Sequence, residues 1–245
     1  MTPSPEPPRV TALRPTHRDP LRFTVKVDGQ AKGTLSQKLI DDLGLAIGSP
    51  WTAELDARMA DAVLYDRAFR AATRRLARRA MSTGMVRQKL RDLAAPPRKP
   101  APAPESDPQQ SSDKTSTPIP PAIIEQVITR LTELDLLDDF AFGQALIRDL
   151  TRAKPAGPMF LKQKLFAKGL APALIDRLVA DATADPDQQA DAATAFAQKK
   201  IRPMAHLDPD TIKRRLYGQL ARRGFAPDAI RTAMDAVLRD PLHDD

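Results

Sequence analysis

The feature that most constrains the fold of this chain is a helical hairpin whose sequence pattern occurs twice. In residues 214–230, Leu216 and Leu220 lie among arginines and are followed by Gly224 and a proline. Residues 161–175 repeat the leucines, the glycine and the proline in the same register. Leucines four positions apart share one face of a helix, glycine can adopt the left-handed conformation that ends it, and proline suits the first turn of the next helix. The pattern therefore predicts a chain built from helical repeats.

A third copy of the hairpin is split by an insertion. Residues 86–90 give its basic half, and residues 121–124 resume its second half. The intervening residues 94–119 are rich in proline and polar residues, so we expect a disordered, semi-extended tether. An insertion without a binding role is favoured over a recognition segment, because the entropic cost of closing a loop grows only slowly with its length.

Outside the hairpins, residues 21–27 alternate apolar and polar side chains, which predicts a half-buried strand, and Asp28 with Gly29 predicts a hairpin turn after it. Residues 51–80 are expected to form two helices, with a break near Tyr65 and Asp66. The expected fold is mainly α, with tandem three-helix repeats forming a curved, elongated array and a small N-terminal β element. The predicted parts are a disordered tail, 1–8; a β-hairpin and helix element, 9–65; and three repeats, 66–136, 137–184 and 185–240.

Two serines are predicted to cap helices. Ser36 precedes a short helix, and Ser82 precedes the basic helix of the first repeat. Met85 occupies the position where a capping box would place Glu or Gln, so the box that begins at Ser82 is incomplete. Gly224 is expected to hold a positive φ angle.

The charge of the chain is positive and unevenly distributed. The chain has 38 Lys and Arg residues and 31 Asp and Glu residues. Residues 67–100 alone contain eleven Lys or Arg and one acid, Asp92. Such a cluster favours a polyanion or an acidic partner, although any single exposed base can simply solvate a helix. The candidate partner-binding residues are the basic residues of the three hairpins: Arg74, Arg75, Arg78, Arg79, Arg87, Lys89, Lys162, Lys164, Lys168, Arg214, Arg215, Arg222 and Arg223.

Catalytic and metal-binding patterns are missing from the sequence. There is no cysteine, the three histidines are far apart, and there is no phosphate-binding loop or nucleophile elbow. Asp138 and Asp139 could form a carboxylate pair, but a helix cap is favoured because no histidine or third ligand lies near them. We therefore expect a binding protein without a metal or cofactor.

No membrane segment is expected either. No apolar run approaches the roughly 20 residues that a spanning helix needs, and the first residues lack the pattern of a signal peptide. The absence of cysteine is compatible with a reducing cytoplasm.

Over about residues 9–240, the chain resembles the RecX family of recombinase regulators. The third repeat carries the most specific features, namely Lys199 and Lys200, the sequence Leu-Tyr-Gly at 216–218 and Leu-Ala-Arg-Arg-Gly-Phe at 220–225. The sequence Leu-Asp-Asp at 137–139, followed by Phe142, and the pair Gly157-Pro158 are similar to the family's middle repeat.

The resemblance implies a non-enzymatic, cytoplasmic bacterial protein, expected to be a monomer. It would bind the RecA recombinase and its nucleoprotein filament through a basic concave face, inhibit ATP hydrolysis and strand exchange, and so modulate recombination, DNA repair and the SOS response. Weak nonspecific DNA binding is also expected from the basic residues. Whether the protein caps filament ends, lies in the filament groove or sequesters monomers stays open.

The alternative is a DNA-binding transcriptional regulator that uses a basic hairpin as a helix-turn-helix. All three hairpins carry mainly Lys and Arg, which favour phosphates over base edges, and none is distinguished as a base reader. Aromatic residues make up 4% of the chain and most fall on apolar stripes, which argues against stacking on single strands.

Overall fold

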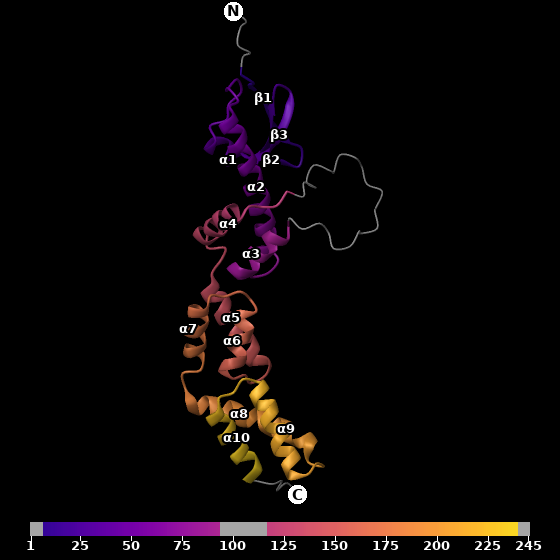
Figure 1. Cartoon of the computed structure of the whole chain (residues 1–245), viewed down its shortest axis with the longest axis vertical. Helices are drawn as coiled ribbons and strands as arrows, with labels where there is room; N and C mark the ends of the chain where they lie inside the picture. Colours follow the sequence, from indigo (N-terminus) through magenta and orange to yellow (C-terminus); the bar gives the residue numbers. More distant parts are fainter. Residues whose placement is uncertain (1–6, 94–116, 240–245) are drawn as a thin grey trace, which may run out of the picture. The chain divides into compact units, whose positions relative to one another are not determined.

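The computed structural model describes residues 7–93 and 117–239 and is mainly helical, with one small sheet (Figure 1). The predicted tail and tether fall largely outside these residues. Where they are described, their ends belong to the fold. The Pro8 carbonyl accepts a hydrogen bond from the Trp51 backbone N–H at 2.6 Å. The Ile119 side chain is buried, and the Thr117 carbonyl accepts a hydrogen bond from Arg67 at 3.1 Å. The segments predicted as tail and tether therefore end in residues that accept hydrogen bonds from the fold or bury apolar surface.

The predicted hairpin is present within a three-stranded antiparallel sheet. Asp28 and Gly29 have φ angles of 46° and 83°, the paired positive values that a two-residue hairpin turn requires. Val25, Val27 and Leu35 bury one face of the sheet. The strands, in spatial order, are β1 (Val10–Thr16), β2 (Asp19–Val27) and β3 (Gln30–Ser36).

Two helices cover the sheet, α1 (Gln37–Asp42) and α2 (Ala53–Leu76). The predicted break near Tyr65 is wrong, since α2 is continuous and contains no Gly or Pro. Its Asp66 is instead buried in an ion pair with Arg22 of β2, so a polar residue that suggested a helix end lies inside the helix. Ser36 stands at the N-cap position of α1, but its side chain makes no capping hydrogen bond.

The chain divides into two compact units. Of the described residues, 7–79, 86–93 and 117–136 form unit 1, and 80–85 and 137–239 form unit 2. In unit 1, α2 packs against β3 on one side and against α4 (Pro121–Glu133) on another. The helix α3 (Thr83–Asp92) buries Val86 and Leu90. The boundary predicted between residues 65 and 66 lies inside α2, because this one helix belongs to both the β element and the first repeat.

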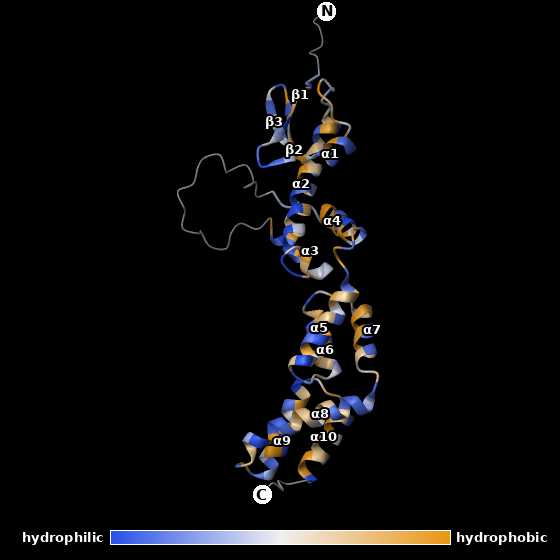
Figure 2. Cartoon of the chain, turned by 180° about the vertical axis from the view of Figure 1, so that it is seen from behind, coloured by the Kyte–Doolittle hydropathy of each residue, from blue (hydrophilic) through white to orange (hydrophobic). Residues whose placement is uncertain are grey.

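Unit 2 contains two three-helix groups, each with its own core. Figure 2 shows hydrophobic and hydrophilic stretches within the same helices, as expected for helices that pack on one side. The buried side chains of the first group centre on Leu161, Leu165 and Leu178, and those of the second on Leu216 and Leu220. The first group is α5 (Asp139–Ala153), α6 (Pro158–Phe166) and α7 (Pro172–Ala182); the second is α8 (Pro186–Ile201), α9 (Pro209–Arg222) and α10 (Pro227–Arg239), with a short 3₁₀ turn at Arg202–Met204 after α8.

Aspartates and a serine cap the helices as the sequence indicated. The Asp138 carboxylate accepts a hydrogen bond from the Ala141 N–H at 2.9 Å, and Ser82 Oγ accepts one from the Met85 N–H at 3.1 Å. The neighbouring Asp139 accepts a hydrogen bond from the Thr83 N–H at 2.7 Å. The two acids of this pair therefore satisfy N–H groups at the starts of two different helices, which accounts for both without a catalytic role.

Asp208, the N-cap of α9, provides a test of these caps. Its pKa is lowered, mainly by hydrogen bonds from Thr211, whose N–H lies 2.8 Å from Oδ1. A lowered pKa in the folded state means that the ionised cap stabilises the fold above pH 4, and that this stabilisation is lost as the pH falls through the folded pKa. Asn also caps helices but does not titrate. We expect the difference in thermal midpoint between the wild type and Asp208→Asn, followed by circular dichroism, to shrink from pH 7 to about pH 3. A constant difference would contradict this explanation.

Candidate partner-binding surface

The predicted partner-binding residues occupy comparable places in both units. In unit 1, Arg74 and Arg75 lie in the last turn of α2, Arg78 and Arg79 follow it, and Arg87 and Lys89 lie on α3. In unit 2 they lie on or just after α6 and α9: Lys162, Lys164, Lys168, Arg214, Arg215, Arg222 and Arg223. The structure therefore gathers them into one set within each unit. A single face formed by both sets stays a prediction.

Several basic residues of unit 1 are already engaged. Arg87 makes a two-point contact with Glu125, with distances of 2.7 Å from Nε and 2.8 Å from Nη2 to the carboxylate oxygens. The same contact lowers the pKa of Glu125. Arg75 donates a hydrogen bond to the Ala71 carbonyl at 2.8 Å, and Lys89 lies 3.5 Å from Asp92. The exposed Arg74, Arg78 and Arg79 are thus the residues of this set best placed to meet a partner.

The basic residues of unit 2 separate in the same way. Lys162 pairs with Asp176 of α7 at 2.6 Å, and Lys164 Nζ lies 5.1 Å from the centre of the Phe160 ring. The α9 arginines make no side-chain hydrogen bond or ion pair within the described residues; they are Arg214, Arg215 and Arg222. Residues seven apart on a helix share a face, so Arg215 and Arg222 point to the same side of α9.

Arg223 differs from its neighbours. Its Nε donates a hydrogen bond to the Pro155 carbonyl at 2.6 Å, and its Nη2 donates one to the Lys154 carbonyl at 2.8 Å. The guanidinium also lies 4.1 Å from the centre of the Phe160 ring, and burial lowers its pKa. Arg223 is therefore not a free base on the surface of α9. Two of its five N–H donors are already used inside the protein.

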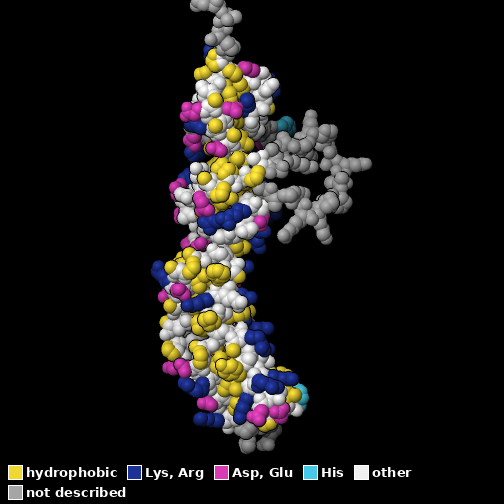
Figure 3. All heavy atoms as spheres, in the orientation of Figure 1, with side chains coloured by type: hydrophobic (Ala, Val, Ile, Leu, Met, Phe, Trp, Pro, Cys, Tyr) yellow, Lys and Arg dark blue, Asp and Glu magenta, His cyan; other side chains and the backbone are white. Residues whose placement is uncertain are grey.

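Large exposed apolar side chains accompany the basic residues, and they were not among the residues predicted to form the surface. Met159 and Phe166 on α6 are 66% and 68% exposed, and Tyr217 on α9 is 54% exposed. On the face seen in Figure 3, hydrophobic and acidic side chains separate the Lys and Arg side chains over α9. The sequence of α6 already indicated exposed apolar residues, because apolar residues occur on both sides of this helix. In the structure, only Leu161 and Leu165 of α6 are buried. The surface is thus mixed rather than uniformly basic.

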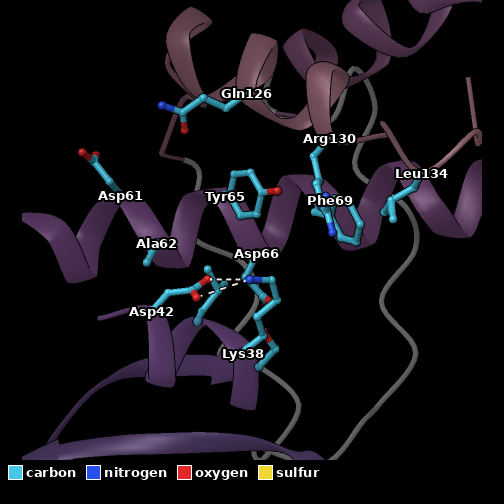
Figure 4. Close-up of a pocket in the computed structure, with 12 residues that line it drawn as sticks. Lys38, Asp42, Asp61, Ala62, Tyr65, Asp66, Phe69, Gln126, Arg130 and Leu134 are labelled. Atoms are coloured by element: carbon cyan, nitrogen blue, oxygen red, sulfur yellow. Dashed lines mark hydrogen bonds and ion pairs between the residues drawn. The ribbon is translucent and has the colours of Figure 1, made fainter. Parts of the chain in front are cut away.

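Unit 1 also contains a cavity of about 650 Å³ between α1, α2 and α4 (Figure 4). The rings of Tyr65 and Phe69 stack beside it, with centres 6.0 Å apart. Burial raises the pKa of Tyr65. Two of the carboxylates that line the cavity are held in ion pairs, Asp42 with Lys38 and Asp66 with Arg22. They do not form the pair of free acids that general acid and base chemistry would use.

The part of the chain that the structure describes contains neither a candidate metal site nor a candidate membrane span. No group of three or more His, Cys, Asp or Glu side chains there could hold a metal ion. None of the helices described is both long enough and apolar enough to cross a membrane.

Comparison with known proteins gives a consistent result. One family model, described as the third three-helix domain of RecX, matches residues 187–234, and another, described as its second three-helix domain, matches residues 138–178. The regulatory protein RecX of Chlorobium phaeobacteroides is 34% identical over 118 residues, which cover 48% of this chain and 74% of the relative. That of Streptomyces coelicolor is 33% identical over 129 residues, covering 51% and 68%.

Solved structures agree on the fold. A crystal structure of regulatory protein RecX superposes with a TM-score of 0.72 at 18% identity, covering 93% of this chain and 99% of that one. RecX from Lactobacillus salivarius gives a TM-score of 0.56 at 19% identity, covering 72% and 98%.

Proposed function

Because the chain belongs to the RecX family, we propose that it binds the RecA recombinase and its nucleoprotein filament and lowers RecA's ATPase and strand-exchange activities. In this proposal the protein is a cytoplasmic monomer without catalytic activity, and it modulates recombination, DNA repair and the SOS response. Its affinity for bare DNA is weak and nonspecific.

The observation that carries this proposal is the placement of exposed bases on α9. Arg214, Arg215 and Arg222 lie on a helix whose Leu216 and Leu220 are buried in the core, and they have no ion-pair partner within the described residues. Unpaired charges on a rigid helix attract an acidic or polyanionic partner without first breaking internal contacts. A recombinase filament supplies both acidic protein surface and DNA phosphates.

The proposed contact residues are the predicted bases whose side chains remain available, those in surface ion pairs, which exchange partners at little cost, and Arg75, which is held only by a hydrogen bond to a carbonyl of its own helix. Arg223 is left out because its guanidinium is bound internally. The set is Arg74, Arg75, Arg78, Arg79, Arg87, Lys89, Lys162, Lys164, Lys168, Arg214, Arg215 and Arg222.

A charge-removal experiment tests the surface. We expect the double variant Arg215→Ala/Arg222→Ala to lose about tenfold or more in affinity for the RecA filament, or about 1.4 kcal/mol, and to inhibit DNA-dependent ATP hydrolysis correspondingly less. The control is Arg231→Ala/Arg239→Ala, which removes the same charge from the exposed side of α10, where both arginines pair with acids of their own helix. An equal loss in both proteins would show that net charge, not the α9 surface, governs binding.

A second comparison separates the proposal from the DNA-binding regulator. At one salt concentration, the wild type should bind the filament more tightly than the same DNA without RecA. Raising the salt concentration cannot distinguish the two functions, since contacts with DNA phosphates weaken in the same way as contacts with an acidic protein surface. Equal affinity for the filament and for naked duplex, or preference for one short duplex sequence, would favour the regulator.

A further inference from the structure

The second and third repeats of unit 2 cap each other's helices. The Gly157 N–H donates a hydrogen bond to the Arg223 carbonyl at 3.0 Å, and the Met159 N–H donates one to the Gly224 carbonyl at 3.1 Å. These N–H groups belong to the start of α6, and the carbonyls belong to the end of α9. Groups at both kinds of helix end lack partners inside their own helix. The contact therefore satisfies N–H groups at the start of α6 and carbonyl groups at the end of α9 at the same time.

The Arg223 side chain extends this contact to a third helix. Its two hydrogen bonds end on the carbonyls of Lys154, the C-cap of α5, and of the following Pro155. A cation is favourable there because the C-terminus of a helix carries a partial negative charge. The flat guanidinium meanwhile lies over the ring of Phe160, in the first turn of α6. One side chain thus holds the ends of α5, α6 and α9 together.

We propose that Arg223 is a positioning residue that fixes α9 relative to α6, so that the bases of the second and third repeats meet the partner in one arrangement. This inference rests on the proposed function and deepens it. A surface that is already rigid loses less conformational freedom on binding, which raises its affinity. The role of Arg223 is then indirect, in contrast to the adjacent and exposed Arg222.

The chemistry requires arginine at this position. A lysine would keep the charge but would lack both the forked donors and the planar group that stacks on a ring. The corresponding residue after α6 is Lys168, and there the contact is built differently, since the hydroxyl of Ser82 donates a hydrogen bond to the Lys168 carbonyl. The Lys168 side chain is exposed. Arg223 is therefore specific to the contact between α6 and α9.

The test uses the absence of cysteine from the chain, which allows two spin labels to be attached without a background. Ala173→Cys on α7 and Asp210→Cys on α9 place labels on exposed residues of the two repeats, outside the proposed contact residues. Pulsed electron paramagnetic resonance gives the distribution of distances between the two spin labels. We expect Arg223→Ala and Arg223→Lys to broaden this distribution, whereas Arg231→Lys on the exposed side of α10 leaves it as in the wild type. An unchanged distribution in Arg223→Ala would overturn the proposal.

Binding measured on the same proteins completes the test. We expect Arg223→Lys to lose about three- to tenfold in affinity for the RecA filament although its charge is kept, and Arg231→Lys, which keeps its charge on α10 outside the proposed contact residues, to lose less than about twofold. A broadened distribution with unchanged affinity would overturn the positioning role. If the wild type itself fails to bind the filament, the proposed function fails, while the distance measurement, which needs no partner, still decides whether Arg223 holds the helices.

Discussion

Replacing Gly224 with valine is expected to lower the free energy of unfolding by about 3 to 5 kcal/mol. Gly224 has a φ angle of 78°, a region in which a β-branched residue is strained. A Cβ atom at this position would also lie 2.1 Å from the backbone nitrogen of Phe160 and 2.8 Å from its Cβ. Backbone atoms cannot rotate away as the end of a flexible side chain can, so α6 and α9 would have to separate. Urea denaturation followed by circular dichroism measures the loss.

Gly44 provides the matched control for this substitution. Its φ angle is 63°, also in the left-handed region, but nothing lies within 4 Å of the place where its Cβ would be. Gly44→Val should therefore show only the conformational cost, about 1 to 2 kcal/mol. The additional loss in the free energy of unfolding at Gly224 measures the contact between the repeats. Equal losses in the two variants would mean that α6 and α9 do not approach this closely in solution.

Removing one partner of the buried ion pair in unit 1 is expected to have an effect of similar size. Arg22 Nη2 lies 2.6 Å from the Asp66 carboxylate, and the two side chains are 11% and 8% exposed. Asp66→Ala would leave the Arg22 guanidinium without its counter-ion in a largely buried site. We expect this to cost about 3 to 5 kcal/mol in the free energy of unfolding, measured by urea denaturation.

Two further variants make this prediction specific. Asp42→Ala breaks the pair with Lys38, whose side chains are 69% and 52% exposed, and should cost less than about 1 kcal/mol. Replacing both buried partners, as in Arg22→Met/Asp66→Leu, should recover much of the loss because no unpaired charge remains. A loss for Asp66→Ala no greater than that for Asp42→Ala would show that water reaches the pair.

Local sequence patterns were sufficient for the secondary structure of the repeats. The leucine spacing gave the apolar faces that Leu161, Leu165, Leu216 and Leu220 bury. The hairpin turn at residues 28 and 29 was predicted in the same way. These features depend on residues within one or two turns of each other, so the sequence of each segment already contains the physical cause.

Local patterns were misleading where a distant residue changed the environment of a side chain. Asp66 looked like the end of a helix, but Arg22, three elements earlier on β2, neutralises it and lets α2 continue. Ile119 looked like part of a tether because prolines flank it, yet its own side chain is buried.

What the sequence by itself determined is therefore the helices, their caps, the hairpin turn and the repeating pattern that relates this chain to its family. Only the tertiary structure decided which of two adjacent arginines is available to a partner. Arg222 and Arg223 are equivalent as residue types, but the carbonyls that bind Arg223 lie 68 and 69 residues away in sequence. Periodicity reports which side of a helix is apolar; it carries no information about which unsatisfied carbonyls another repeat brings within reach of a particular guanidinium.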